Sequence, residues 1–404
     1  MRARPVAEQG VLTIDRMGER GDGMAAARAV PRTLPGEVLQ LDAKGAFHIL
    51  KPSTERIAPF CPVFDRCGGC KLQHWAPSPY QAWKRGLLQN ALQAKGVTTT
   101  INALVDAHGH GRRRAVFHVR ECEGAWQAGF MAAGTHALVP IVSCPILVPR
   151  LQTTPALAAR FGPLFGNCDV QITAADNGLD IAIKAHRKLG DKAVQGLAGL
   201  MQEHKVARIA VNGETLTQLQ APFIVIGPGR VALPIGAFLQ ATQQGEETLA
   251  ELVLANIGKA RHVADLFCGL GPFALRLASK YTVTAIDSDK PAMAAVAQAL
   301  RFVQGLRPVT PQVRDLFRNP LTAVELNTFD AVVLDPPRQG AEAQCQNLAA
   351  SKIKRVVMVS CDVQSFARDA AILVAADFNL ETVTPVDQFK YSAHLECVGV
   401  FKRR

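Results

Sequence analysis

The sequence predicts an α/β protein in which a doubly wound, mostly parallel sheet follows a small β-barrel and a central α+β region. After residue 240, buried apolar runs alternate with helical segments, which is typical of a parallel sheet with crossover helices. A glycine-rich turn follows the first of these runs, where such sheets bind their ligands. Near the N-terminus, Gly and Pro separate short apolar pieces, which favours a small barrel. The 404 residues suffice for two or three domains.

Charge and cysteine usage narrow the class of protein. Lys and Arg number 45 against 34 acidic residues, and the formal net charge of +11 suits a polyanionic partner such as RNA or DNA. No apolar run approaches the roughly 18 to 20 residues of a membrane span. No apolar region follows the basic N-terminus, so we expect a cytoplasmic protein without a signal peptide or membrane partner. Ten cysteines in that compartment favour metal binding or catalysis over disulfides.

Residues 1–55 form the predicted barrel. Barrels of the OB type bind single-stranded nucleic acid, which would agree with the basic charge. A structural appendage with no RNA role is the alternative interpretation.

Residues 56–240 form the predicted central α+β RNA-binding domain, and a cysteine motif lies near its start. Cys61, Cys67 and Cys70 have the spacing C-x5-C-x2-C, and the two glycines between the last two let the backbone turn tightly. Thiolates at such spacing select zinc or an iron–sulfur cluster. Helix 78–95 follows, and we expect it to pack between domains.

Three thiols leave one ligand position open. The best candidate is Cys144, in the string S-C-P, and Cys122 and Cys168 are the alternatives. The remainder of this region reads as an antiparallel sheet, with a hairpin that turns at residues 176–178.

Residues 241–404 form the predicted doubly wound domain. Its strands are expected at 263–267, 283–286, 329–334 and 356–359, and a last strand at 397–401 is expected to close the sheet. Several of them end at a polar side chain, where chemistry is located in such sheets. Asp287, Asp335 and Cys361 are these residues.

The turn D-L-F-C-G-L-G after the first strand lets a ligand approach the backbone beside a helix N-terminus. Asp287, about twenty residues further on, can accept hydrogen bonds from both ribose hydroxyls of a nucleoside. The turn is not G-x-G-x-x-G. The pattern therefore favours S-adenosylmethionine over NAD.

Several strings together resemble the RNA uracil-C5-methyltransferase family over nearly the whole chain. They are C-x5-C-G-G-C with a later S-C-P, F-L-Q at 238–240, D-L-F-C-G-L-G, V-L-D-P-P-R, V-S-C-D, and H-L-E at 394–396. The cysteine strings resemble the 23S ribosomal RNA branch of the family. The N-terminal part resembles a shortened TRAM domain.

The resemblance implies a Rossmann-like, S-adenosylmethionine-dependent methyltransferase domain and roles for individual residues. Cys361 matches the nucleophile that attacks C6 of uracil, and Glu396 matches the base that removes the C5 proton. The implied contacts with S-adenosylmethionine come from Gln240, Phe267, Asp287, Asp315 and Asp335. The implied ligands of a 4Fe-4S cluster are Cys61, Cys67, Cys70 and Cys144.

The expected reaction is 5-methyluridine formation at a loop uridine of 23S ribosomal RNA by a monomer. The alternatives are the same reaction in transfer RNA, and a non-catalytic RNA-binding or ribosome-assembly factor on this fold. Thr242 and Pro272 depart from the family pattern, because Asn is common at both positions, and they leave cofactor binding there open.

Overall fold

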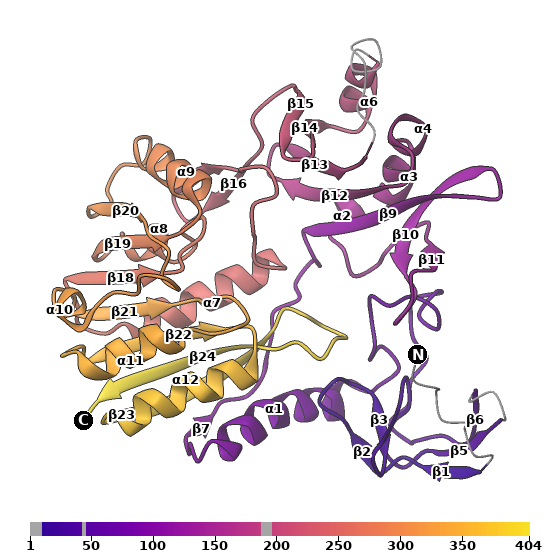
Figure 1. Ribbon diagram of the computed structural model, residues 1–404, viewed down its shortest axis with the longest axis horizontal. Coiled ribbons are helices and arrows are strands. Elements are labelled where there is room, and N and C mark those ends of the chain that lie inside the picture. The colour runs from indigo at the N-terminus through magenta and orange to yellow at the C-terminus, as the bar shows by residue number, and fades with distance from the viewer. Residues whose placement is uncertain (1–9, 43–45, 187–195) are drawn as a thin grey trace.

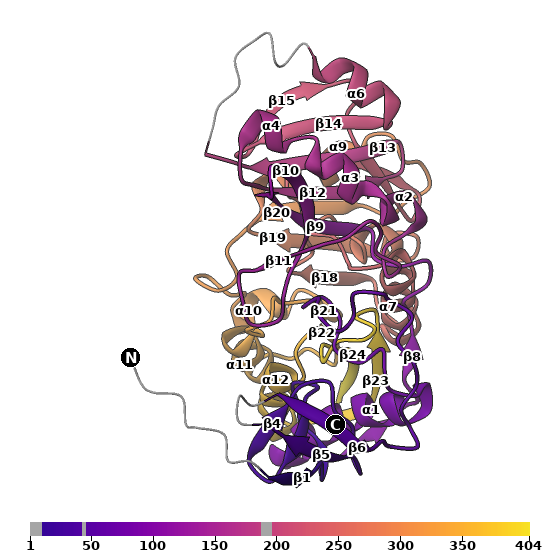
Figure 2. The ribbon, with the colours of Figure 1, turned by 90° about the vertical axis from the view of Figure 1, so that its right-hand side faces the viewer.

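The computed structural model describes residues 10–42, 46–186 and 196–404. It shows a small N-terminal module, a central sheet and a large C-terminal sheet that lie along one elongated molecule (Figures 1 and 2). Among the described residues, no helix has the length and apolar character needed to cross a membrane.

Six short strands make up the N-terminal module, where a barrel was expected. One three-stranded sheet has the order β1-β5-β6 and the other the order β2-β3-β4. The first sheet consists of β1 (Val11–Thr13), β5 (Val38–Leu41) and β6 (Phe47–Lys51); the second consists of β2 (Arg16–Met17), β3 (Gly23–Ala25) and β4 (Arg28–Val30). The alternation of buried and exposed residues in β5 gives the module a small core around Leu39. The assignment to an RNA-binding barrel stays a prediction.

The central sheet has seven strands in the order β11-β10-β9-β12-β13-β14-β15. They are β9 (Arg114–Cys122), β10 (Ala125–Met131), β11 (Leu138–Pro140), β12 (Cys168–Ala175), β13 (Gly178–Lys184), β14 (Val206–Val211) and β15 (Glu214–Gln218). The predicted hairpin at 176–178 joins β12 and β13. All pairs are antiparallel except β13 with β14, so the expected antiparallel sheet is interrupted once.

Short helices cover this sheet, and a hairpin leads to the last domain. The helices are α2 (Pro149–Gln152), α3 (Thr154–Ala159), α4 (Gly162–Phe165) and α6 (Leu197–Glu203). The hairpin of β16 (Phe223–Ile226) and β17 (Gly229–Ala232) packs against the C-terminal domain through α9 (Lys290–Leu300).

The C-terminal sheet has nine strands, with β20-β19-β18-β21-β22-β24-β23-β7 along its path and β8 beside β23. The parallel strands are β18 (His262–Leu266), β19 (Thr282–Asp287), β20 (Val309–Val313), β21 (Ala331–Leu334) and β22 (Arg355–Ser360). The strands β23 (Phe378–Asp387) and β24 (Glu396–Arg403) follow, and β7 (Thr100–Ile101) and β8 (Val105–Asp106) complete the sheet. The prediction that 397–401 closes the sheet is wrong, because β24 lies between β22 and β23.

Helices lie on both faces of this sheet, as the doubly wound prediction requires (Figure 1). They are α1 (Pro77–Ala94), α7 (Gln243–Asn256), α8 (Ala274–Leu277), α9, α10 (Ala323–Leu326), α11 (Glu342–Ala350) and α12 (Val363–Ala375). The buried strands β21 and β22 are apolar on both sides, which explains their continuous runs of Val, Leu and Met. Helix α1 precedes the central sheet in sequence but packs against α12. The cysteine motif at 61–70 is therefore attached to the C-terminal domain through α1.

Candidate functional site

A cavity of about 540 Å³ opens at the carboxyl ends of the parallel strands. This volume lies in the range of small-molecule sites. Residues from every predicted segment of the site line it, namely Gln240, Phe267, Asp287, Asp335, Cys361 and Glu396. The predicted site residues are therefore brought together, with one exception, Asp315.

The glycine turn after β18 forms an open cradle. Phe267, Gly269 and Gly271 all have positive φ values, of 62°, 51° and 74°. A side chain at Gly269 would meet no atom within 4 Å, so the space above this residue is free for a ligand. The amide of Gly269 donates to Asp287 Oδ2 at 2.9 Å, which ties the turn to the end of β19.

Asp287 is held in place at both carboxylate oxygens. Its Oδ1 accepts from the amide of Asp289 at 2.8 Å, while Oδ2 faces the glycine turn. Each oxygen keeps a second lone pair that can accept from a ribose hydroxyl. Phe267 and Phe317, with ring centroids 5.1 Å apart, provide an apolar wall beside this carboxylate.

Asp315 lies next to the cavity but not in its lining, which includes its neighbours Arg314 and Leu316. Its Oδ1 accepts from the amides of Phe317 and Arg318 at 3.0 and 3.2 Å. In this arrangement Asp315 shapes the loop that presents Phe317.

Cys361 and Glu396 are neighbours because β22 and β24 pair antiparallel. Ser360, the last residue of β22, is opposite Cys397, the second residue of β24. Cys361 follows Ser360 and Glu396 precedes Cys397, so these two residues lie side by side at the same edge of the sheet. Burial raises the pKa of the Cys361 thiol to about 12, and the carboxylates of Glu396 and Asp335 add to this effect. The thiol is therefore protonated in the free site at neutral pH.

Two carboxyl groups in the cavity have raised pKa values. Burial raises the pKa of Asp335, and the negative charge of Asp287 contributes. Burial also raises the pKa of Glu396, with Asp335 contributing. Such shifts concentrate at functional sites, because a buried carboxyl group near other negative charges can accept a proton near neutral pH.

Asp362, next to Cys361 in sequence, caps a helix. It is the N-cap of α12, where its Oδ1 accepts from the amides of Gln364 and Ser365 at 3.1 and 2.9 Å. Its carboxylate is thereby directed toward the helix. The N-terminus of α12 lies directly after Cys361, and such a terminus favours negative charge nearby.

Two lining residues, Phe389 and His394, were given no role by sequence reasoning, whereas Arg338 was left open with Gln240 as a donor to the enolate. Arg338 Nη2 lies 2.5 Å from His394 Nδ1, and both residues line the cavity with Phe389. Burial and the charge of Arg338 lower the pKa of His394, which suits a neutral imidazole that accepts from the guanidinium. Phe389 and His394 lie just before Glu396, between β23 and β24, and His394 is also the first residue of the H-L-E string.

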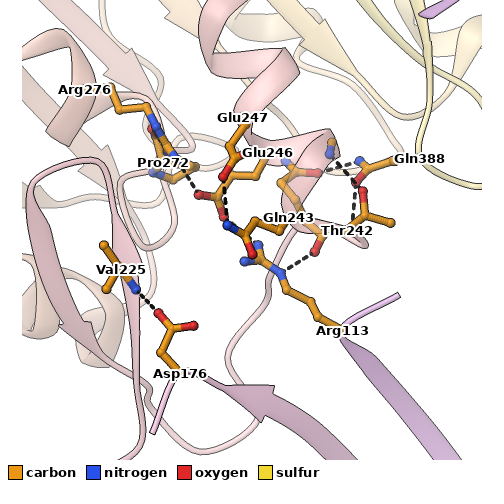
Figure 3. Close-up of polar contacts among 12 residues, drawn as sticks. Arg113, Asp176, Val225, Thr242, Gln243, Glu246, Glu247, Pro272, Arg276 and Gln388 are labelled. Carbon is orange, nitrogen blue, oxygen red and sulfur yellow. Dashed lines mark hydrogen bonds and ion pairs between the residues drawn. The ribbon is translucent and has the colours of Figure 1, made fainter. Parts of the chain in front are cut away.

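Glu246 lies between two arginines that come from different parts of the chain, as Figure 3 shows. Arg113 Nη2 and Arg276 Nη2 contact opposite oxygens of Glu246 at 2.5 and 3.0 Å. Arg113 also donates to the backbone oxygen of Gln240, and Arg276 to that of Pro272. Glu246 thus joins the central sheet, the F-L-Q segment and the glycine turn.

Thr242 and Pro272 are the two departures from the family pattern, and the structure shows the surroundings of each. Thr242 is the N-cap of α7: its Oγ1 accepts from the amide of Gly245 at 2.8 Å and donates to the Ala107 oxygen at 2.6 Å. Pro272 lines the cavity.

A second cavity, of about 250 Å³, lies beside the central sheet and is lined by the predicted cluster ligands. They are Cys61, Cys67, Cys70 and Cys144. All four are free thiols. Of the three candidates for the fourth ligand, only Cys144 is in this lining; Cys122 and Cys168, both in the described part of the chain, are not. Among the described residues, no group of three or more His, Cys, Asp or Glu is arranged to hold a metal ion.

Comparison with known proteins gives a consistent result. Residues 235–404 match the family model described as tRNA (uracil-5-)-methyltransferase. The chain is 44% identical to an uncharacterized RNA methyltransferase of Brucella suis, over 98% of this chain and 99% of that one. It is 28% identical to the 23S rRNA (uracil(1939)-C(5))-methyltransferase RlmD of Vibrio vulnificus, over 99% and 98% of the two chains.

Among solved structures, the chain is similar to the tRNA (uracil-54, C5)-methyltransferase of Pyrococcus abyssi, which was determined with S-adenosyl-L-homocysteine. The TM-score is 0.76 at 18% identity, and the match covers 97% of this chain and 99% of that one. This likeness extends the shared fold over all three parts of the molecule.

Proposed function

Because this chain belongs to the RNA uracil-C5-methyltransferase family and is an S-adenosylmethionine-dependent enzyme, we propose that it methylates C5 of one uridine in 23S ribosomal RNA. The observation that carries the proposal is the shared cavity of Cys361, Glu396 and the glycine turn. The full-length similarity to the 23S rRNA enzyme RlmD of Vibrio vulnificus supports this substrate. The non-catalytic alternative has no support, since the chain keeps all the predicted reacting groups in one site.

The residues of the cavity fit the nucleoside part of S-adenosylmethionine. Asp287 is oriented to accept from ribose hydroxyls, and Phe267 and Phe317 offer an apolar surface to a base. When bound, S-adenosylmethionine supplies an electrophilic methyl group, which C5 of the uracil accepts.

The reaction requires that C5 first become nucleophilic. The Cys361 thiolate forms a bond to C6, and the electron pair of the C5–C6 double bond moves to C5 and O4 as an enolate. After methylation, C5 carries both a methyl group and a proton. Glu396 takes that proton, its electron pair restores the double bond, and the bond from sulfur to C6 breaks to release Cys361.

Hydrogen-bond donors near O4 would stabilise the enolate, and the cavity offers two. Arg338 and the amide of Gln240 both lie in its lining. The uracil must leave its stack to reach these groups, which favours a loop nucleotide.

We also propose that the second cavity binds a 4Fe-4S cluster. Burial raises the pKa of Cys70 to about 11 and of Cys144 to about 12, so these thiols are costly to ionise unless a metal binds them. Cys67 Sγ accepts from the amide of Gly69 at 3.3 Å, a contact typical of cluster ligands. A single ion draws its ligands to one point, whereas a cluster separates its thiolates by its own width. Four thiols that line one cavity therefore suit a cluster better than a single metal ion.

Methyl transfer from tritiated S-adenosylmethionine tests the first proposal. The wild-type protein should label a 23S ribosomal RNA transcript, and Cys361→Ala should reduce the rate by at least roughly a thousandfold, as expected for a lost nucleophile. Cys345→Ala, at a buried thiol outside the cavity, is the matched control. Mapping the labelled nucleotide in RNA from cells lacking the protein identifies the uridine. Label in transfer RNA alone would contradict the ribosomal substrate and leave the chemistry intact.

Iron and sulfide content after anaerobic purification tests the cluster. Cys144→Ser should lose iron and visible absorbance, whereas Cys122→Ser should retain both. A colourless wild-type protein that contains zinc would contradict the cluster.

A further inference from the structure

Gln388, which directly follows β23, is fully buried and contacts two residues that line the cavity, Gln240 and Glu396. Its Nε2 donates to Gln240 Oε1 at 2.7 Å and to Glu396 Oε1 at 2.9 Å. Its Oε1 accepts from the amide of Thr242 at 3.4 Å, and Figure 3 shows these two residues together. The backbone amide can only donate, so the orientation of the Gln388 side chain is determined by its neighbours.

These contacts form part of a longer chain. Gln240 Nε2 donates to Asp335 Oδ2 at 3.1 Å, so two amides join the carboxyl groups of Asp335 and Glu396. The four residues come from four separate segments: the F-L-Q string, the end of β21, the end of β23 and the start of β24. The chain thus couples the orientation of the base to that of Gln240.

Glu396 uses its two oxygens differently. Oε1 accepts from Gln388, while Oε2 is buried and has no hydrogen-bond partner among the described residues. A buried acceptor without a partner is costly, which points to a group that arrives during the reaction. Oε2 is therefore the oxygen available for a proton.

We propose that Gln388 is a positioning residue: it holds Oε1 of Glu396 and leaves Oε2 directed at the C5 proton of the uracil adduct. This rests on the proposed function, in which Glu396 is the base. Gln388 itself neither reacts nor carries charge, and acts only through Glu396 and Gln240.

The electrostatic effect of Gln388 has a definite sign. Burial and the charge of Asp335 raise the pKa of Glu396, and the hydrogen bond from Gln388 opposes them. Other charged or titratable groups around this site include Cys361, Cys397, Arg338, His394 and the Lys84–Asp387 pair. Removing the donor destabilises the carboxylate, so the base ionises only at higher pH.

The test uses the full-length protein and measures, as a function of pH, the rate at which the methylated RNA–protein adduct is released. This rate rises with pH as Glu396 ionises, and the rising part of the profile is its ascending limb. Gln388→Met, which keeps the length of the side chain, should shift the ascending limb upward by about one to two pH units, the effect of one lost hydrogen bond to a charged group. At neutral pH the methylated RNA–protein complex should accumulate on a denaturing gel, because proton removal is slowed after methyl transfer. An unshifted limb would overturn the proposal.

Thr384→Val is the matched control. Thr384 lies on β23 and accepts from Asn102 Nδ2 at 2.8 Å, so this variant loses a hydrogen bond close to Gln388 in sequence and outside the cavity. It should lower thermal stability without moving the limb. If Gln388→Met does not fold, Gln388→Glu should shift the limb in the same direction by repelling Glu396. Failure of both to fold would overturn the proposal in favour of a purely structural amide.

The proposed function is checked separately with Glu396→Gln. That variant should trap the methylated adduct at every pH, whatever Gln388 does. Wild-type protein that methylates RNA without any trapped adduct in Glu396→Gln would refute the base itself. A trapped adduct together with an unshifted Gln388→Met limb would refute only the role of Gln388.

Discussion

At the scale of single residues, the Cys361 thiol, which is the proposed nucleophile, has a raised pKa. Burial comes first among the causes, and the carboxylates of Glu396 and Asp335 come next. Arg338 acts in the opposite direction. Groups that enter the cavity with substrate must therefore change this balance before Cys361 can attack C6.

Alkylation of Cys361 in the free protein tests this balance. Its rate should be low at neutral pH and should rise as the pH approaches the raised pKa, since only the thiolate reacts. At a fixed alkaline pH, where Glu396 is ionised, Glu396→Gln removes one negative charge and lowers the pKa of Cys361, so the rate should rise by about tenfold, equal to about one pKa unit. Mass spectrometry of the peptide that contains Cys361 measures the rate.

Glu251→Gln, an exposed change on α7, is the control for net charge and should leave the alkylation rate unchanged. Equal rates in both variants would show that Glu396 does not influence the thiol.

At the scale of elements, helix α1 supports the loop that carries Phe389 and His394. Lys84, on α1, is fully buried and contacts Asp387 Oδ1 at 2.5 Å and the His394 oxygen at 2.7 Å. Tyr80 donates to Asp387 Oδ2 at 2.7 Å. Helix α1, which follows the cysteine motif in sequence, thus positions the loop that leads into β24. Because Glu396 is the first residue of β24, the same contacts position Glu396.

Lys84→Met should destabilise the protein by about 3–5 kcal/mol, because it leaves Asp387 buried without its cation. Chemical denaturation measures this loss. The double variant Lys84→Met/Asp387→Leu should recover part of the stability, since no unpaired buried charge remains.

Arg355→Met provides the comparison for that ion pair. Arg355 and Glu381 form a partly exposed pair between β22 and β23, and its loss should cost less than about 1 kcal/mol. Similar losses for Lys84→Met and Arg355→Met would contradict the anchoring role of α1.

At the scale of the whole molecule, Glu246 joins the central sheet to the glycine turn. Arg113 contributes from the position directly before β9 and Arg276 from α8, and the Arg113 and Glu246 side chains are at least nine-tenths buried. The backbone oxygens of Gln240 and Pro272, two residues that line the cavity, are therefore supported by arginines bound to one glutamate.

Arg113→Met should weaken S-adenosylhomocysteine binding by about tenfold, equivalent to about 1.4 kcal/mol, because Glu246 and the Gln240 backbone lose a common support. Calorimetry measures the affinity. Arg208→Met breaks a buried ion pair with Asp180 that lies within the central sheet, and should reduce stability without changing affinity. If Arg113→Met instead reduced stability without changing the affinity, Arg113 would contribute to folding alone.

The sequence by itself determined the local features of the site: the glycine turn, the acidic ends of β19 and β21, the thiol at the end of β22, and the double-sided burial of the parallel strands. These depend on residue type, short spacing and periodicity, all of which act along the chain. Only the tertiary structure decided that β24 lies between β22 and β23, that Cys144 rather than Cys122 or Cys168 faces the other cysteines, and that Gln388 holds Glu396. Those outcomes depend on contacts between residues far apart in sequence, where many pairings are compatible with the same local pattern and the packing of the whole core selects one.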